Sequence, residues 1–399
     1  MTTIRVFLET SAGPVEVGTA DVERLRGVTT THFAYDRTYL AAQGWDLSPD
    51  LPAITAEAVT EGLPGAFDDS APDAWGRNLI ARRSARAWEG HGAPTLTEVE
   101  YLLGVSDLTR QGALRFSAGD HFLAESTGVP QMLELERLLD AATAVAGGAD
   151  ADEAVVALLD AGSGSLGGAR PKASVADDGA LFIAKFPHPD DRWDVTRWEA
   201  VALDLAEACG LRVPDHRLEL VGPAPIVLVR RFDRRGDERL SYLSGQSLVG
   251  AGSGAGDYLE LVEAITDHGS DVEADLSELW RRIAFTIAIN NTDDHLRNHG
   301  FLRDRGGWTL SPLFDVNPTP DPRAARVMSI RGETASEGSR IALFDTAEQF
   351  WLGPAEAEQH WRNIMEVVST WRSFAAERGL SPEELEPFAA ALDRWTDEG

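Results

Sequence analysis

Two acidic residues and one asparagine in the second half of the chain have the spacing of a phosphoryl-transfer site. Asp293 is followed by four residues and then by Asn298, and Asp315 comes after a further short segment. In kinases such a first Asp accepts the proton of the substrate hydroxyl, while the Asn and the second Asp hold Mg²⁺ on the ATP phosphates. The pattern predicts phosphoryl transfer from ATP, with Asp293 as the catalytic base and Asn298 and Asp315 as the Mg²⁺ ligands.

The residues around these three predict the elements that position them. Residues 279–289 carry apolar side chains at helical spacing, so we expect a buried helix that ends in a polar run beginning at Asn290. Short strands at residues 300–302 and 308–310, joined by a glycine turn, predict a hairpin between the two acidic residues. From this segment alone, a helix end followed by a capped loop without catalytic function remains the alternative.

A second segment has the composition of a phosphate-binding loop. Residues 162–172 (GSGSLGGARPK) are rich in glycine, which lets backbone N–H groups approach phosphate oxygens. The Walker A spacing is absent, and a flexible linker is the alternative. Lys185, in the apolar strand that follows, predicts a contact to the ATP phosphates, with Glu199 of the next helix as its partner. A solvent-facing lysine on an edge strand is the alternative for Lys185.

Another apolar strand ends at residues 230–232 (Arg-Arg-Phe). We expect a hinge between two lobes here, where backbone groups would contact adenine; a charged run on the surface is the alternative. Strands dominate the stretch that carries the glycine loop, and helices dominate from about residue 255 onward. We therefore expect an α+β, bilobal protein-kinase-like fold with a mixed, β-rich N-lobe at 126–232 and a mainly helical C-lobe at 233–399. An additional N-terminal α/β subdomain is expected at 1–125.

The composition limits the classes of partner. The chain has 36 basic and 65 acidic residues and a formal net charge of −29, which argues against this chain alone gripping a nucleic-acid backbone. Its single cysteine, Cys209, excludes a disulfide framework within one chain. No signal peptide is recognisable, and no apolar run approaches the ~20 residues that span a bilayer, so we expect a cytoplasmic protein without membrane contact.

Together these segments resemble the HipA-type toxin kinases of bacterial toxin–antitoxin modules. The resemblance covers most of the chain, and its specificity comes from the ordered set of motifs. The segments that carry it are Asp69–Arg77 (DSAPDAWGR), Ser165–Lys172 (SLGGARPK), Lys185 in IAKFP, Arg231–Arg234 (RFDR), Asn291–Asn298 (NTDDHLRN) and Pro312–Val316 (PLFDV).

The resemblance implies a serine/threonine protein kinase that uses ATP and Mg²⁺. It assigns Asp293 as catalytic, Asn298 and Asp315 as metal ligands, and Ser165 as a site of autophosphorylation that expels the phosphate loop and silences the kinase. The residues it implies for ATP binding are Gly167, Gly168, Ala169, Arg170, Pro171, Lys172, Lys185, Glu199, Arg230, Arg231, Phe232, His295, Leu296, Arg297, Asn298, Phe314 and Asp315.

The resemblance also implies partners. These are a small helix-turn-helix antitoxin, DNA reached only through that antitoxin, and a protein substrate of the aminoacyl-tRNA synthetase type whose phosphorylation leads to growth arrest or persistence. Two other functions stay open: a small-molecule phosphotransferase, which shares the spacing of Asp293, Asn298 and Asp315, and a catalytically silent subunit of an antitoxin–DNA repressor complex.

Overall fold

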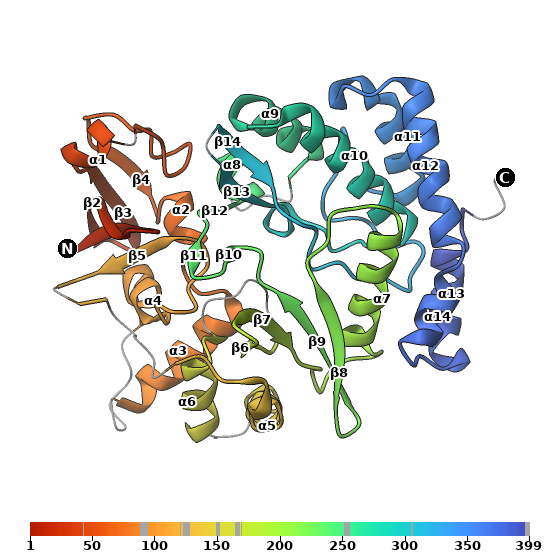
Figure 1. The fold of residues 1–399 in the computed structure, drawn as a ribbon, viewed down its shortest axis with the longest axis horizontal. Helices are drawn as coiled ribbons and strands as arrows, with labels where there is room; N and C mark the ends of the chain where they lie inside the picture. The colour runs from red at the N-terminus through yellow and green to blue at the C-terminus, as the bar shows by residue number, and fades with distance from the viewer. Residues whose placement is uncertain are drawn as a thin grey trace. The chain divides into compact units, whose positions relative to one another are not determined.

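The computed structural model describes residues 1–42, 44–87, 95–119, 121–122, 128–148, 152–163, 168, 170–250, 256–304 and 306–395 (Figure 1). The chain divides into two compact units. The first comprises residues 1–190, 221–224 and 228–243, and the second comprises residues 191–220, 225–227 and 244–399. Mixed strands and helices in the first unit, and mainly helices in the second, confirm the predicted α+β class.

The first unit begins with a five-stranded antiparallel sheet in the order β4-β3-β2-β1-β5. Its strands are β1 (Thr2–Thr10), β2 (Gly13–Leu25), β3 (Val28–Tyr35), β4 (Ala58–Glu61) and β5 (Leu114–Ser117). Ile4, Val6 and Leu8 alternate along β1 and are buried, because one face of the sheet packs on the core. Val6 lies opposite Gly18, where a Cβ would come within 2.4 Å of the Ala34 carbonyl oxygen, so this position requires glycine.

Helices continue the first unit. They are α1 (Arg37–Ala42), α2 (Gly65–Asp68), α3 (Ala74–Ala87), α4 (Glu98–Gly104), a short 3-10 helix at Met132–Glu134, α5 (Leu135–Ala146) and α6 (Asp152–Asp160). Helix α1 contacts β2 of this sheet, whereas α6 packs on α3 and α5. Helix α4 begins in a capping box, in which the Thr97 side chain accepts from the Glu100 backbone and the Glu100 side chain accepts from the Thr97 backbone.

A hairpin follows the glycine-rich segment. β6 (Lys172–Asp177) and β7 (Ala180–Lys185) are joined by Asp178 and Gly179, both at positive φ (46° and 76°). Two successive residues at positive φ are what a tight hairpin turn needs to match the twist of the flanking strands. The sheet order is β6-β7-β9-β8, with β8 at His216–Val221 and β9 at Ala224–Arg230. Three short strands follow: β10 (Arg234–Arg235), β11 (Glu238–Arg239) and β12 (Tyr242–Ser244).

The second unit is mainly helical. Its elements are α7 (Val195–Ala208), α8 (Gly245–Val249), α9 (Tyr258–His268), α10 (Val272–Ala288), a 3-10 turn at Leu296–Asn298, β13 (Gly300–Asp304), β14 (Gly307–Leu310), α11 (Ser336–Asp345), a 3-10 turn at Ala347–Phe350, α12 (Pro354–Val368), α13 (Trp371–Glu377) and α14 (Pro382–Leu392). Helix α10 is the buried helix that the apolar spacing predicted, and it begins seven residues earlier than expected because acidic residues start its first turn. The predicted hairpin is formed by β13 and β14.

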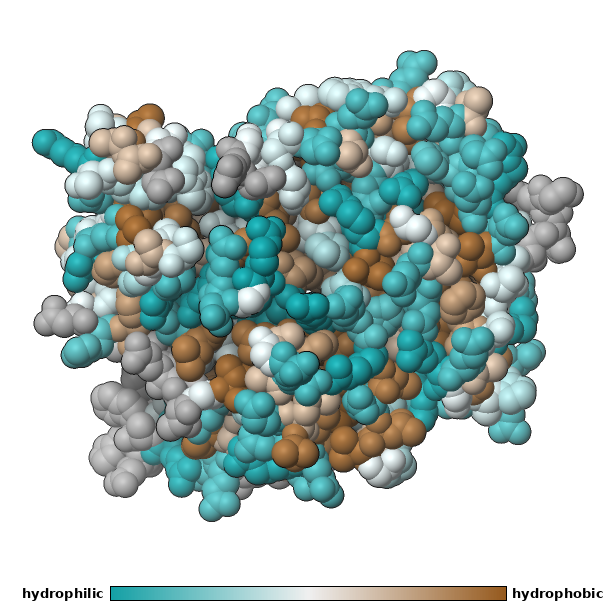
Figure 2. Space-filling view, in the orientation of Figure 1, coloured by the Kyte–Doolittle hydropathy of each residue, from teal (hydrophilic) through white to brown (hydrophobic). Residues whose placement is uncertain are grey.

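In the face shown, hydrophilic residues are spread over the surface and hydrophobic residues form groups between them (Figure 2). Within the described ranges, none of the helices combines the length and the apolar character that crossing a bilayer requires.

Candidate active site

The segment after helix α10 forms the loop that presents Asp293. Asn290 ends the helix with a φ of 54°, a conformation that asparagine tolerates better than most residues. Its side-chain amide donates to the carbonyl oxygens of Thr319 (2.7 Å) and Asp321 (3.0 Å), which fixes the start of the loop. Asp293 is exposed, whereas Asn298 is buried and its amide nitrogen lies 3.4 Å from the Asp293 carbonyl oxygen. The structure therefore brings the predicted base and one predicted metal ligand into one short loop.

Asp294, the neighbour of the predicted base, anchors this loop in the core. Its buried carboxylate accepts a short hydrogen bond from the Tyr258 hydroxyl and lies 3.2 Å from His299 Nε2. Burial disfavours the charged carboxylate, but the charge and hydrogen bond of His299, the hydrogen bond of Tyr258 and the charge of Arg326 outweigh it. The pKa of Asp294 is lowered to about 2. A pair of adjacent acids thus divides into an exposed Asp293 and a buried structural Asp294.

Arg326 completes this anchor. Its guanidinium is buried and donates to the Asn291 carbonyl oxygen (3.1 Å), to the Tyr258 hydroxyl (2.8 Å) and to the Thr286 hydroxyl (2.8 Å). It therefore joins helices α9 and α10 to the loop that carries Asp293. Sequence reasoning missed Tyr258, His299 and Arg326 as supports of the site, because their pairing is set by the fold and leaves no local pattern.

Asp315, the second predicted metal ligand, is in an uncommon backbone conformation. Its φ is 56°, a left-handed value that costs a non-glycine residue energy and that persists only where surrounding contacts enforce it. The pKa of Asp293 is raised, mainly because burial disfavours its charged form. The charge of His295 lowers this pKa, and the negative charges of Asp315 and Asp294 raise it further. The negative charge of Asp315 therefore acts on Asp293.

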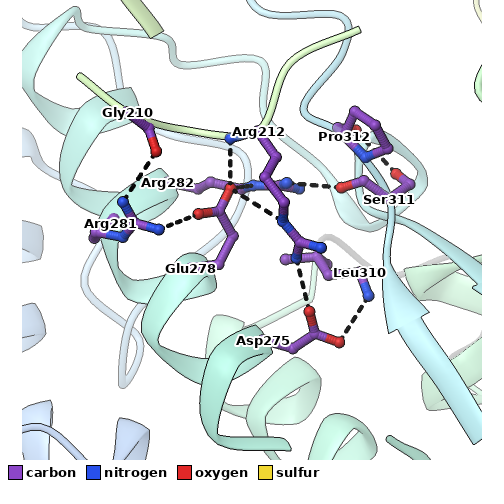
Figure 3. Close-up of polar contacts among 9 residues, drawn as sticks. All are labelled: Gly210, Arg212, Asp275, Glu278, Arg281, Arg282, Leu310, Ser311 and Pro312. Atoms are coloured by element: carbon purple, nitrogen blue, oxygen red, sulfur yellow. Dashed lines mark hydrogen bonds and ion pairs between the residues drawn. The ribbon is translucent and has the colours of Figure 1, made fainter. Parts of the chain in front are cut away.

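A network of charged residues, of which Asp275, Glu278 and Arg282 are buried, holds the strand end that leads to Asp315 (Figure 3). Asp275 of helix α10 accepts from the Leu310 backbone N–H (2.8 Å) and from Arg212 Nη2 (2.7 Å). The Leu313 backbone N–H in turn donates to the Arg212 carbonyl oxygen (2.7 Å). These contacts pin both sides of the turn between β14 and Asp315 to helix α10.

Glu278 and Arg282, one helical turn apart, form the centre of the same network (Figure 3). Glu278 Oε1 accepts from Arg282 Nε (3.0 Å) and from the Arg212 backbone N–H (3.0 Å), and Glu278 Oε2 accepts from Arg281. Arg282 Nη2 then donates to the Ser311 carbonyl oxygen (2.7 Å). The i, i+4 spacing of Glu278 and Arg282 was a signal that could have found them, although it more often marks an exposed helix face.

The remaining residues predicted around Asp293 and Asp315 lie in the same segments. Leu296 is buried, His295 and Phe314 are half-buried, and Arg297 is exposed. Glu199 lies in helix α7 of the second unit and is buried.

The glycine-rich segment belongs to the first unit, and its two ends are tied together. The Ser163 hydroxyl donates to the Lys172 carbonyl oxygen at 2.5 Å. Gly162 has a φ of 67°, and a Cβ there would lie 2.1 Å from the Thr109 hydroxyl oxygen. Ser165, Gly167 and Ala169 lie outside the described residues, whereas Gly168, at φ 106°, and residues 170–172 lie within them.

The two predicted phosphate-binding lysines face each other across the β6–β7 hairpin. Lys172 and Lys185 are Cα partners in its register, so their side chains lie on one face. Lys185 is half-buried. Lys172 is buried, and its ammonium group donates to Asp73 Oδ2 at 2.7 Å.

The predicted hinge is built around a buried arginine–aspartate pair. Arg231 donates to both carboxylate oxygens of Asp233 (2.9 and 2.6 Å) and to the carbonyl oxygens of Thr109 (2.5 Å) and Arg110 (3.2 Å). Burial opposes the charge of Asp233, but Arg231 and Arg234 outweigh it, and the pKa of Asp233 lies well below its usual range. The Arg231 side chain thus ties the strand end to residues 109–110.

Arg230 and Phe232, the neighbours of Arg231 in the predicted hinge, differ in exposure. Arg230 is exposed, and the ring of Phe232, which is half-buried, lies 6.3 Å from that of Tyr242.

The donor set at the site fits Mg²⁺ only together with phosphate oxygens. The described residues contain no group of three or more His, Cys, Asp or Glu side chains that could hold a metal by themselves. Mg²⁺ in nucleotide sites is bound by one or two protein oxygens, with phosphates and water supplying the rest. The Asn298 amide oxygen and the Asp315 carboxylate match that requirement.

Comparison with known proteins identifies two matched regions of the chain. Residues 164–371 match the model of the HipA-like C-terminal domain, and residues 11–102 match that of the HipA N-terminal domain. The chain is 25% identical over 184 residues to Y4mE of Sinorhizobium fredii, a match that spans 42% of this chain and only 41% of Y4mE.

Among solved structures, the chain resembles HipA of Shewanella oneidensis MR-1, solved as a complex of HipA, HipB and operator DNA. The TM-score is 0.65 at 15% identity, over 99% of this chain and 97% of that chain. The Helicobacter pylori proinflammatory kinase CtkA matches at a TM-score of 0.39 and 14% identity, over 57% of this chain and 94% of that chain. The architecture and the Shewanella match confirm the predicted protein-kinase-like fold.

Proposed function

Because the chain belongs to the HipA family, we propose that it is an ATP-dependent serine/threonine protein kinase acting as the toxin of a toxin–antitoxin module. The observation that carries this proposal is the arrangement of Asp293, Asn298 and Asp315 in the second unit. The two carboxylates interact electrostatically, and Asn298 shares the loop of Asp293. Phosphoryl transfer needs positioned charges more than covalent chemistry, and these residues can supply them.

The proposed role of each residue follows from its environment. The raised pKa of Asp293 favours uptake of a proton from a substrate hydroxyl. Asn298 and Asp315 would hold Mg²⁺, which, when bound, neutralises charge on the ATP phosphates. The buried Asp294 and Arg326 keep the loop of Asp293 in one shape, so that little reorganisation is needed during the reaction.

The nucleotide-binding half of the proposal involves the other predicted residues. The loop from Gly167 to Lys172 and the Lys185 ammonium group would meet the phosphates, with Glu199 as the partner of Lys185. Arg230 to Phe232 would border adenine, and His295 to Asn298 with Phe314 would close the site. Ser165 would be autophosphorylated, and about two added negative charges would oppose the return of the loop to ATP.

The proposed partners follow from the family and from charge. The Shewanella HipA is found with HipB and operator DNA, so we expect a helix-turn-helix antitoxin to bind this chain. A net charge of −29 leaves DNA contact to that partner. The proposed substrate is a cytoplasmic protein of translation, with an aminoacyl-tRNA synthetase as one candidate.

The test is phosphotransfer by the purified chain with Mg²⁺ and γ-labelled ATP, followed by mapping of labelled residues by mass spectrometry. We expect label on Ser165 and on proteins of a bacterial lysate, and none with Asp293→Ala. Asp267→Ala, which alters an exposed acid of helix α9 in the same unit, is the matched control and should retain activity. Label on sugars or aminoglycosides in place of protein would instead support a small-molecule phosphotransferase.

A further inference from the structure

Asp73 joins two segments that are far apart in the chain. It precedes helix α3, where its Oδ1 accepts from the Gly76 backbone N–H at 2.7 Å and so caps the first turn. Its Oδ2 accepts from the Lys172 ammonium group, also at 2.7 Å. The two side chains are 9% and 2% exposed, so the ion pair lies almost entirely out of water.

Lys172 requires such a partner because of its place in the sheet. It is the first residue of β6 and lies directly opposite Lys185 on β7, and like charges in opposed positions repel. A buried ammonium group is also costly without a counter-charge. The Asp73 carboxylate meets both requirements.

The same lysine closes the base of the glycine-rich segment. Its carbonyl oxygen accepts from the Ser163 hydroxyl, which joins the second and last residues of the segment. Holding the Lys172 side chain therefore holds both ends of the loop. Asp73 lies within residues 11–102 and Lys172 within residues 164–371, so the ion pair links the two regions that match HipA domain models.

We propose that Asp73 is a positioning residue for the phosphate loop, and that Lys172 acts through this ion pair while Lys185 provides the cation for the ATP phosphates. The inference rests on the proposed ATP-dependent function. It predicts that the N-terminal region controls nucleotide affinity through the Asp73 turn, whereas a direct phosphate contact by Lys172 would make the two residues act independently.

The test is a double-mutant cycle of MgATP affinity by calorimetry on the full-length chain. Asp73→Asn keeps the capping oxygen and removes the charge, and Lys172→Met removes the other partner. We expect each substitution to weaken MgATP binding about tenfold, or about 1.4 kcal/mol. The double variant should bind MgATP with about the same affinity as the single variant that binds it less tightly. KM for ATP should rise in parallel, with kcat changed less than twofold.

Two further variants guard against a purely structural effect. Asp36→Asn alters an acid that caps helix α1 of the same unit through the Thr38 and Tyr39 backbones, and it should bind MgATP like the wild type. Lys172→Arg keeps a cation for Asp73 and should stay within threefold of the wild type. Should Lys172→Met not fold, Asp73→Asn and Lys172→Arg decide the question.

Each result has a distinct reading. Unchanged or tighter MgATP binding by Asp73→Asn would overturn the inference, because it would show that freeing Lys172 does not harm, or even helps, the nucleotide site. Losses that multiply in the double variant would overturn it as well. A wild-type chain that binds no MgATP would overturn the proposed function itself, and with it this inference.

Discussion

Replacing Glu278 by glutamine tests whether the network around Arg282 holds the second unit together. Glu278 and Arg282 are 2% and 1% exposed, and their atoms meet at 3.0 Å. Glutamine keeps an oxygen for Arg282 Nε and for the Arg212 backbone N–H, so the change removes the negative charge and the acceptor for Arg281. The pKa of Arg282 is lowered to about 10 by burial even though Glu278 is present, so the guanidinium already sits in an unfavourable environment for its charge.

The size of the effect follows from that burial. Removing one partner of a buried ion pair costs about 3–5 kcal/mol. We expect the lower end, about 3 kcal/mol, because the hydrogen bonds to Arg282 Nε and to the Arg212 backbone survive and only the one from the half-buried Arg281 is lost. Arg212 adds little, since its side chain is 48% exposed and screened by water. For a unit of about 150–250 residues, about 3 kcal/mol lowers the midpoint of thermal unfolding by about 6–12 °C.

The assay is thermal unfolding followed by circular dichroism at neutral pH. Glu273→Gln is the matched control, because Glu273 is an exposed residue of the same helix, and it should shift the midpoint by less than about 2 °C. Equal midpoints for Glu278→Gln and Glu273→Gln would refute the reasoning that an uncompensated Arg282 charge destabilises this unit.

Three further predictions concern other parts of the chain. The pKa of Asp294 is about 2 in the folded chain against an ordinary value of 3.8, so its charged form adds about 2 kcal/mol to the free energy of unfolding above pH 4, and this is lost toward pH 2. In denaturant titrations, the difference in the free energy of unfolding between wild type and Asp294→Asn should therefore shrink from about pH 4 to about pH 2. Gly162→Ala should lower the thermal midpoint more than Gly179→Ala, because both have positive φ but only the first meets Thr109; equal midpoints would refute this. The raised pKa of Asp293 places the acid limb of kcat/KM above pH 3.8, and a pH–rate profile with the limb lower would contradict that.

The elements next to the predicted site could be predicted because their signals are local. Helix α10 was foreseen from apolar spacing, and the β13–β14 hairpin from its glycine turn. The strands β3, β4 and β5 were not foreseen. β5 pairs with β1, which lies far from it in the sequence, so no local pattern predicts the pairing. β3 carries a run of polar threonines that weakens the alternating pattern.

The supports of the site were harder to predict than the site itself. Lys172 was expected to meet ATP phosphates, whereas in the structure its ammonium group also has a counter-charge, Asp73, from the N-terminal region. Arg326 follows Asp315 in the chain and folds back under the loop of Asp293. Such contacts depend on how distant segments pack, which residue types and spacing alone do not determine.

The measurement that most directly tests the proposed function is transfer of the γ-phosphate of labelled ATP by wild type, Asp293→Ala and Asp267→Ala with Mg²⁺. We predict label on Ser165 and on lysate protein for the wild type and for Asp267→Ala, and loss of label for a folded Asp293→Ala. Full phosphotransfer by Asp293→Ala would contradict the assignment of the catalytic base and the kinase mechanism built on it.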